Sequence, residues 1–429
     1  MGIFRETEQL TEAPVVGPEI CSIHEAIHFR QLFREVGPLV FLERTVQANV
    51  ISARKLLTAF GLRLPLRFHS RPEDVHHGLL LMAISHEMGK RAKLPYYNSV
   101  DDAVALIKRC NNIVVVTGAG VSTSLGIPDF RSKGTGLYSR LSHLGLSDPQ
   151  EAFDIHVFRE DPTIFYSTVR EIVVNIDRFT PTHAFIALLQ KKGKLLTNYS
   201  QNIDNIEAKA GILPGKLVQC HGSFATASCV MCAYRCNGDA IMPTIREGRI
   251  PRCPRCAPKE RTTANSRKRK LAEGTRSRPR RRGDLDDTSE SEYDVPSNGG
   301  VMKPDITFFG EQLPDVFSRR LVQVDRHKVD LVIVIGTSLA VAPVSELVRI
   351  VPSHIPQVYI SLEPVKHVNF DIDLLGPCDV VVSELCRRAG WDLRHEMIPK
   401  GQVVDVALEE GYKSRHRFLD VTDEVGARK

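Results

Sequence analysis

Short runs of β-branched residues recur along the chain and predict the strands of a buried sheet. The runs at 113–116 and 330–335 are almost wholly apolar, as expected of parallel strands that are covered on both faces. Weaker runs lie at 194–198, 217–222, 356–361 and 379–382. Segments with helical spacing of apolar residues, such as 101–109 and 182–192, precede strands. This alternation of helix and strand predicts an α/β fold.

The first 95 residues or so have a different pattern, helical spacing without a chemical motif. The stretches 41–51 and 77–84 are read as amphipathic helices. His76, His77 and His86 lie here, but no pattern of cysteines or carboxylates around them suggests a metal site. We therefore expect a small helical module for docking or oligomerisation.

The strand at 113–116 ends in a glycine turn that has the chemistry of an anion site. Gly118 and Gly120 allow a tight turn and a close approach of phosphates to the backbone, and the residues after them could open a helix whose N-terminus favours an anion. The usual dinucleotide fingerprint has a third glycine where Thr123 stands, so the turn alone fits a simple connection equally well. The following loop, 126–131, is rich in acidic, aromatic and basic side chains, which favours a site.

Polar or glycine-rich residues follow several of the predicted strands. They lie at 117–131, 198–204, 221–223, 336–338 and 361–363. In an open α/β sheet the ligand crevice lies outside the carboxyl ends of the strands, so these segments are expected to converge on one site. Glu363 is suited to binding ribose hydroxyls, although its distance along the chain differs from that in simple dinucleotide-binding proteins.

Four cysteines form two C-x-x-C pairs. Cys229 and Cys232 are separated by 20 residues from Cys253 and Cys256. Thiolates at this spacing predict a tetrahedral structural zinc site, with free thiols or a disulfide as the alternative. Cys236 lies outside both pairs and could substitute as a ligand. A site closed by four cysteines has no open coordination position, so it is not expected to be the catalytic centre.

Charge is concentrated in one segment. The chain carries a net charge of +6, and 257–283 alone contains 11 Lys or Arg against 2 acids, followed by 6 acids and no base at 284–294. Such a segment is expected to be disordered. Its two basic clusters are typical of a bipartite nuclear-import signal, with non-specific contact to nucleic acid or histones and a solvated linker as alternatives. No sequence-specific nucleic-acid binding is expected. No membrane span is expected either, because no apolar run approaches about 20 residues.

Together these motifs resemble the sirtuins, the NAD-dependent protein deacetylases. The matching segments are GAGVSTSLGIPDFRS from Gly118, YSQNID from Tyr199, QCHGS from Gln219, the two cysteine pairs, KPDITFFGE from Lys303 and GTSL from Gly336. They run in family order from about Asp101 to Trp391. The chain is most similar to fungal nuclear, silencing-type members.

The resemblance implies an architecture. We expect a Rossmann-like parallel-sheet domain (96–225 and 300–395) with a helical insertion at about 135–180, a smaller inserted zinc module (226–258), a disordered insertion (259–299), an N-terminal helical extension (1–95) and a C-terminal tail (396–429). One zinc ion would be structural, and NAD would be consumed as a cosubstrate.

The resemblance also implies roles for particular residues. His221 would be the general base, with Asn202 as a second catalytic residue. The glycine turn would wrap the diphosphate, the QNID segment would line the nicotinamide ribose, and the later strand ends would bind the adenosine. The cofactor residues implied are Gly118, Ala119, Gly120, Ser122, Ile127, Asp129, Phe130, Arg131, Gln201, Asn202, Ile203, Asp204, Gly336, Thr337, Ser338, Ser361, Leu362, Glu363 and Cys378. Ser361 departs from the asparagine common at its position in the family.

The implied reaction is deacetylation of acetyl-lysine, with histone tails as substrates and silencing as the process. The acetyl oxygen would attack the anomeric carbon of the nicotinamide ribose, nicotinamide would leave, and lysine and O-acetyl-ADP-ribose would follow. The substrate peptide would add a strand near 301–304 and 337–341, and corepressor or chromatin proteins would bind the N-terminal module. Alternatives are a catalytically weak chromatin scaffold, and ADP-ribosyl transfer or long-chain deacylation at the same site.

Overall fold

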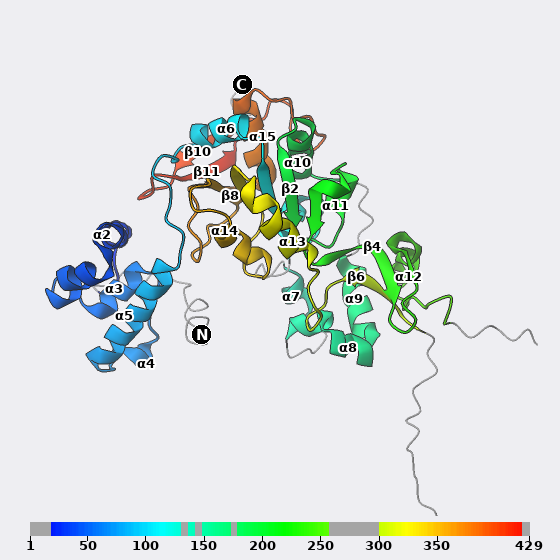
Figure 1. The fold of residues 1–429 in the computed structure, drawn as a ribbon, viewed down its shortest axis with the longest axis horizontal. Helices are drawn as coiled ribbons and strands as arrows, with labels where there is room; N and C mark the ends of the chain where they lie inside the picture. Colours follow the sequence, from blue (N-terminus) through cyan, green and yellow to red (C-terminus); the bar gives the residue numbers. More distant parts are fainter. Residues whose placement is uncertain (1–18, 130–135, 142–147, 173–177, 257–299, 423–429) are drawn as a thin grey trace, which may run out of the picture. The chain divides into compact units, whose positions relative to one another are not determined.

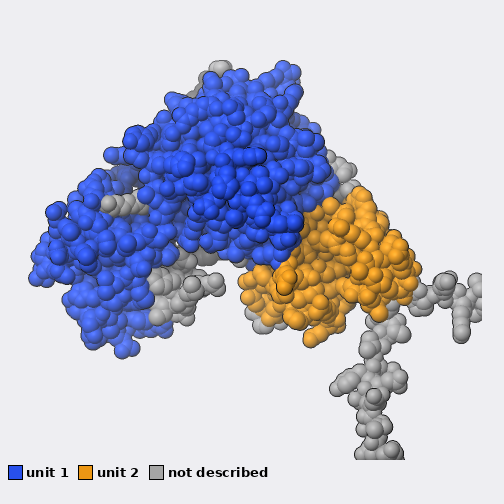
Figure 2. Space-filling model, in the orientation of Figure 1, with its two compact units in different colours: residues 1–139, 175–221, 313–429 blue, residues 140–174, 222–312 orange. Residues whose placement is uncertain are grey.

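The computed structural model describes residues 19–129, 136–141, 148–172, 178–256 and 300–422 (Figure 1). The charged insertion (259–299) lies outside the described residues, as do two of the expected cofactor residues, Phe130 and Arg131. The chain divides into two compact units, one comprising Met1–Ser139, Asn175–His221 and Leu313–Lys429, the other Arg140–Val174 and Gly222–Gln312 (Figure 2). The domain boundaries expected from the sequence stay a prediction. In the described ranges, no helix combines the length and the apolar character that crossing a membrane requires.

The first unit is built on an eight-stranded sheet in the order β10-β11-β9-β8-β7-β1-β2-β3. The strands are β1 (Ile113–Thr117), β2 (Leu195–Ser200), β3 (Leu217–Gln219), β7 (Leu331–Ile335), β8 (Gln357–Ser361), β9 (Ile372–Leu375), β10 (Val404–Leu408) and β11 (Arg415–Asp420). All neighbouring pairs are parallel except β10 with β11. The chain order reverses between β1 and β7, which makes this pair the topological switch point. The α/β fold with a Rossmann-like sheet is thereby confirmed.

Helices cover both faces of this sheet. Successive side chains of β1 point to opposite faces, and those on each face are buried against helices. Ile113 and Val115 point into one core with α6 (Val100–Arg109), α10 (Pro181–Lys191) and α15 (Cys378–Ala389). Val114 and Val116 point into the other, with α13 (Val316–Gln323) and α14 (Leu347–Ile350). All five residues of β1 are buried, as the run of β-branched residues predicts.

The second unit contains a small antiparallel sheet in the order β5-β4-β6. Its strands are β4 (Gly222–Cys229), β5 (Arg235–Asn237) and β6 (Met302–Ile306), and its helices are α8 (Ile155–Glu160), α9 (Pro162–Ile172) and α12 (Met242–Arg246). Edge-to-face aromatic pairs fill its core, among them Phe158 with Phe308 at 5.2 Å between ring centroids.

The N-terminal residues form helices around their own apolar cluster. They are α2 (Ile23–Leu42), the π-helical turn Glu43–Gln47, α3 (Ala53–Ala59), α4 (Leu66–His69) and α5 (Glu73–Met88). Phe33, Phe41 and Phe60 pack edge to face in this cluster. The helix expected at 77–84 is confirmed within α5, whereas the one expected at 41–51 ends at Gln47 and belongs to a longer helix bent at Gly37. The docking role stays a prediction.

Three expectations need correction. The run at 379–382 is not a strand but the first turn and a half of α15, in which Val381, Val382 and Leu385 face the sheet at helical spacing. The glycine turn leads into two 3₁₀ turns, Ala119–Val121 and Thr123–Leu125, and not into an α-helix. Residues 396–429, expected as a tail, contribute β10 and β11 to the main sheet.

The segment before α6 is attached to the sheet by a buried ion pair. The guanidinium of Arg91 donates to both carboxylate oxygens of Asp371 at 2.9 Å, and the backbone N–H groups of Leu94 and Gln357 also donate to that carboxylate. The side chains of Arg91 and Asp371 are only 5% and 0% exposed. Removing one partner therefore leaves an uncompensated charge away from water.

We expect Asp371→Ala to lower the free energy of unfolding by about 3–5 kcal/mol, as measured by chemical denaturation. The matched control is Asp392→Ala, which removes a carboxylate from an arginine pair whose side chains are 87% and 68% exposed. That variant should lose no more than about 1 kcal/mol. Similar losses in the two variants would contradict the role assigned to the buried pair.

Candidate cofactor site and metal centre

The glycine turn after β1 packs directly against the turn after β7. The N–H of Gly118 donates to the Ile335 oxygen at 3.1 Å, and the N–H of Gly120 donates to the Gly336 oxygen at 2.8 Å. A β-carbon added to Gly120 would lie 2.8 Å from the Gly336 α-carbon, which no side chain tolerates. The two backbones can approach this closely only because both residues are glycine, and their contact lies at the switch point of the sheet, where α/β proteins bind dinucleotides.

The QNID segment after β2 is hydrogen-bonded to both of these turns. Gln201 Nε2 donates to Thr337 Oγ1 at 2.8 Å, and Asn202 Nδ2 donates to the Gly118 oxygen at 3.2 Å. Asp204 accepts the Ser122 hydroxyl at 2.9 Å, and burial raises the pKa of this carboxyl. Residues far apart in the sequence thus form one hydrogen-bonded group at the carboxyl ends of β1, β2 and β7.

His221 follows β3 and has one ring nitrogen fixed by the same segment. Its Nδ1 lies 3.0 Å from the Gln201 carbonyl oxygen. A carbonyl can only accept, so this contact requires the proton on Nδ1 and leaves the lone pair of the neutral ring on Nε2. Nε2 is buried and contacts no hydrogen-bond partner among the described residues. The arrangement suits a side chain that takes a proton from a bound ligand.

The remaining expected cofactor residues lie at the carboxyl ends of β1, β2, β7, β8 and β9 or in the segments that follow these strands. Ala119 belongs to the glycine turn, Ile127 is buried and Asp129 is partly buried in the loop beyond it, and Ile203 lies between Asn202 and Asp204. Ser338 follows β7, while Ser361, Leu362 and Glu363 end or follow β8, with Leu362 and Glu363 exposed. Cys378 is the buried first residue of α15, after β9. Because the carboxyl ends of these parallel strands meet at one edge of the sheet, the residues at the strand ends gather there, and their contacts with a cofactor stay a prediction.

Sequence reasoning missed a buried acid beneath this edge. Glu207, in α11 (Ile206–Lys209), is fully buried and accepts hydrogen bonds from the hydroxyls of Thr117 and Ser200. Burial and the nearby Asp204 carboxylate raise the pKa of Glu207 to about 7. The only signal in the sequence is an acid three residues after Asp204, which an exposed helical turn would show equally well.

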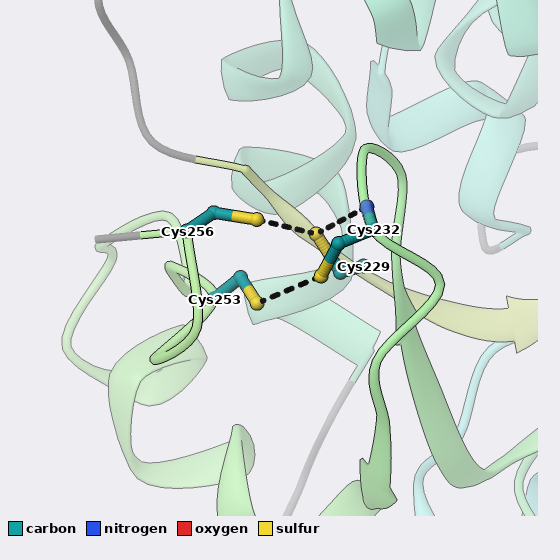
Figure 3. A group of neighbouring side chains, drawn as sticks. All are labelled: Cys229, Cys232, Cys253 and Cys256. Carbon is teal, nitrogen blue, oxygen red and sulfur yellow. Dashed lines mark hydrogen bonds between the residues drawn. The ribbon is translucent and has the colours of Figure 1, made fainter. Parts of the chain in front are cut away.

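The four paired cysteines gather in the second unit. All four sulfur atoms lie within 4.8 Å of one another and point toward a common centre (Figure 3). The Cys229–Cys256 and Cys232–Cys253 sulfur distances are 3.7 and 3.6 Å. A tetrahedron with Zn–S bonds of about 2.3 Å has S···S edges of about 3.8 Å, so the cluster fits one structural zinc ion. Cys236, on β5, does not belong to this group of sulfurs.

Fold and site together define an α/β protein. Its candidate dinucleotide site lies at the switch point of the main sheet, and a separate cluster of four cysteines forms a zinc centre. Residues 118–343 match the model of the Sir2 family. The chain belongs to the Sir2 family.

Curated relatives support the same assignment along most of the chain. The chain is 43% identical over 376 residues to the "NAD-dependent histone deacetylase sir2" of Schizosaccharomyces pombe, an alignment that covers 87% of this chain and 77% of that protein. It is 44% identical over 356 residues to the "NAD-dependent histone deacetylase SIR2" of Kluyveromyces lactis, covering 82% of this chain but 52% of the relative. This chain therefore spans between half and about three quarters of the length of these relatives.

A solved structure described as "Structural Basis for the Mechanism and Regulation of Sir2 Enzymes" is similar in fold. The TM-score is 0.52 at 23% sequence identity, and the alignment covers 68% of this chain and 97% of that one. At this identity the likeness supports the fold alone.

Proposed function

We propose that this chain is an NAD-dependent protein lysine deacetylase that releases nicotinamide and O-acetyl-ADP-ribose. Two curated relatives carry the name NAD-dependent histone deacetylase. The observation that carries the proposal is the orientation of His221, whose Nδ1 is fixed by Gln201 while Nε2 keeps its lone pair beside the cofactor edge.

The residues of the site divide the work of this reaction. NAD supplies an anomeric carbon from which nicotinamide can leave. The glycine turn packs closely against the turn after β7, and the diphosphate would bind over these two turns at the switch point of the sheet. Asn202 is held against Gly118 by a hydrogen bond and would line the nicotinamide ribose. His221 Nε2 would take a proton from a ribose hydroxyl of bound NAD, and the oxygen would thereby become a nucleophile for the acetyl carbon.

We further propose acetylated histone tails as substrates and the nucleus as the place of action. Support comes from the names of the relatives and, within the sequence, from the two basic clusters in the charged insertion. The N-terminal helical module would bind corepressor or chromatin proteins.

The test is nicotinamide release from NAD by the purified chain, with acetylated histone-tail peptide, with the unacetylated peptide and without peptide. We expect release only with the acetylated peptide, matched one for one by the appearance of deacetylated peptide. If folded protein with its zinc bound releases no nicotinamide, the proposal is refuted and the alternative of a catalytically weak chromatin scaffold is favoured. Release without loss of the acetyl group would instead favour ADP-ribosyl transfer.

A further inference from the structure

The buried carboxyl of Glu207 takes no part in the reaction proposed above. Its Oε1 accepts two hydrogen bonds, from Thr117 Oγ1 at 3.2 Å and from the Ser200 hydroxyl. These donors stand at the ends of the two strands that carry the glycine turn and the QNID segment. Each hydroxyl has one proton, so Glu207 fixes the direction in which both hydroxyls present their lone pairs.

The lone pairs of these two hydroxyls accept hydrogen bonds from residues at the carboxyl ends of β1 and β2, where the cofactor is expected to bind. Ser200 Oγ accepts the backbone N–H of Asn202 at 3.0 Å, and Asn202 Nδ2 in turn reaches the Gly118 oxygen at 3.2 Å. Thr117 Oγ1 accepts from Asn198 Nδ2 at 3.2 Å. A continuous chain of hydrogen bonds therefore runs from Glu207 through Ser200 and Asn202 to the glycine turn.

We propose that Glu207 is a positioning residue for the NAD site, and that it acts as a neutral carboxylic acid whose carbonyl oxygen orients Ser200 and, through it, Asn202. The inference rests on the proposed function for its effect on turnover, but not for its statement about protonation.

The surroundings favour the neutral form. Both donors converge on one oxygen, as on the carbonyl of an un-ionised acid, while Oε2 is buried without a hydrogen-bond partner among the described residues. The titratable groups that act on it are an acid, Asp204 in the segment before α11, and a buried thiol, Cys220 after β3. Lys209 acts on Asp204. A carboxylate here would carry its charge away from water and beside another carboxylate.

Two substitutions separate hydrogen bonding from charge. Glu207→Gln keeps the carbonyl acceptor and mimics the neutral acid, whereas Glu207→Ala leaves two buried hydroxyls without their acceptor. At pH 7 we expect Glu207→Ala to raise the KM for NAD about tenfold or more with little change in the KM for peptide, and Glu207→Gln to stay within about threefold of the wild type. Glu410→Gln, the same change at an exposed position, is the control.

Protonation is measured separately, by thermal unfolding of wild type and Glu207→Gln between pH 5 and pH 9. An acid with a pKa of about 7 in the folded state and about 4.3 unfolded binds more protons when folded. The wild type should therefore lose Tm relative to Glu207→Gln as the pH rises toward 7, and the gap should level off above about 8.

Parallel Tm curves would overturn the neutral form, and equal losses in Glu207→Gln and Glu207→Ala would overturn the positioning role. If Glu207→Ala does not fold, Glu207→Gln becomes the deciding variant. Complete loss of turnover in folded Glu207→Gln would then overturn the proposal. A wild type that turns over no NAD refutes the proposed function instead, while the unfolding experiment still decides whether Glu207 is neutral.

Discussion

Replacing His221 with alanine is expected to lower deacetylation of an acetylated peptide by about 10²–10⁴-fold, the usual contribution of a general base. The loss follows from the geometry, because Nδ1 is used to hold the ring against Gln201 and Nε2 is the atom left to accept a proton. The variant should still bind NAD, since the glycine turns and the QNID segment are hydrogen-bonded to one another without the imidazole. Deacetylated peptide is measured by mass spectrometry, and NAD binding by calorimetry.

A second readout separates this role from a general loss of the site. If His221 acts after nicotinamide has left, exchange of labelled nicotinamide into NAD in the presence of acetylated peptide should fall much less than deacetylation. His354→Ala, which removes an exposed histidine before β8, should leave both activities unchanged. Equal losses of exchange and deacetylation in His221→Ala would show that the side chain shapes the site and is not the base.

Most of the sheet could be predicted from sequence because its central strands are buried on both faces. β1 and β7 are runs of β-branched and apolar residues that no exposed element would carry. The error at 379–382 has the opposite origin: Val380, Val381 and Val382 favour a strand by propensity, but they lie in α15, from which Val381 and Val382 pack against the sheet. β9 has only four residues and lacks that signal. β10 and β11 have exposed faces, so a pattern of buried residues could not reveal them.

Site residues that belong to a recognisable sequence motif could be predicted, whereas a residue whose role depends on its burial could not. The glycines at 118, 120 and 336 are visible in sequence because a close backbone approach admits no other residue. The roles assigned to the individual cofactor residues came from resemblance and stay predictions. Glu207 could not be found, because a buried acid and an exposed one look alike in a four-residue helix, and only the hydroxyls of Thr117 and Ser200 in space distinguish them.

The zinc centre determines more of the second unit than its size suggests. Its cysteines come from the end of β4 and the turn after it, and from the segment at 253–256, which lies in no long strand or helix. The Cys253 N–H donates to the Gly300 oxygen at 2.7 Å, and the Met302 N–H donates to the Pro251 oxygen at 2.9 Å. These backbone bonds join the two segments that flank the charged insertion, and a metal held by the four cysteines would attach the first of these segments to the end of β4, so loss of the metal should loosen both.

Cys253→Ser is accordingly expected to abolish stoichiometric zinc and to expose the second unit to proteolysis and hydrogen exchange, because binding of a structural zinc ion contributes on the order of 10 kcal/mol to folding. The main sheet, whose two cores contain none of the four cysteines, should keep its protection. Cys236→Ser makes the same chemical change in the same module but outside the cluster, and should retain one zinc per chain. Zinc retained in Cys253→Ser, or lost in Cys236→Ser, would show that the ligand set differs from the four cysteines. Loss of zinc without loss of protection would show that the module folds by its aromatic core alone.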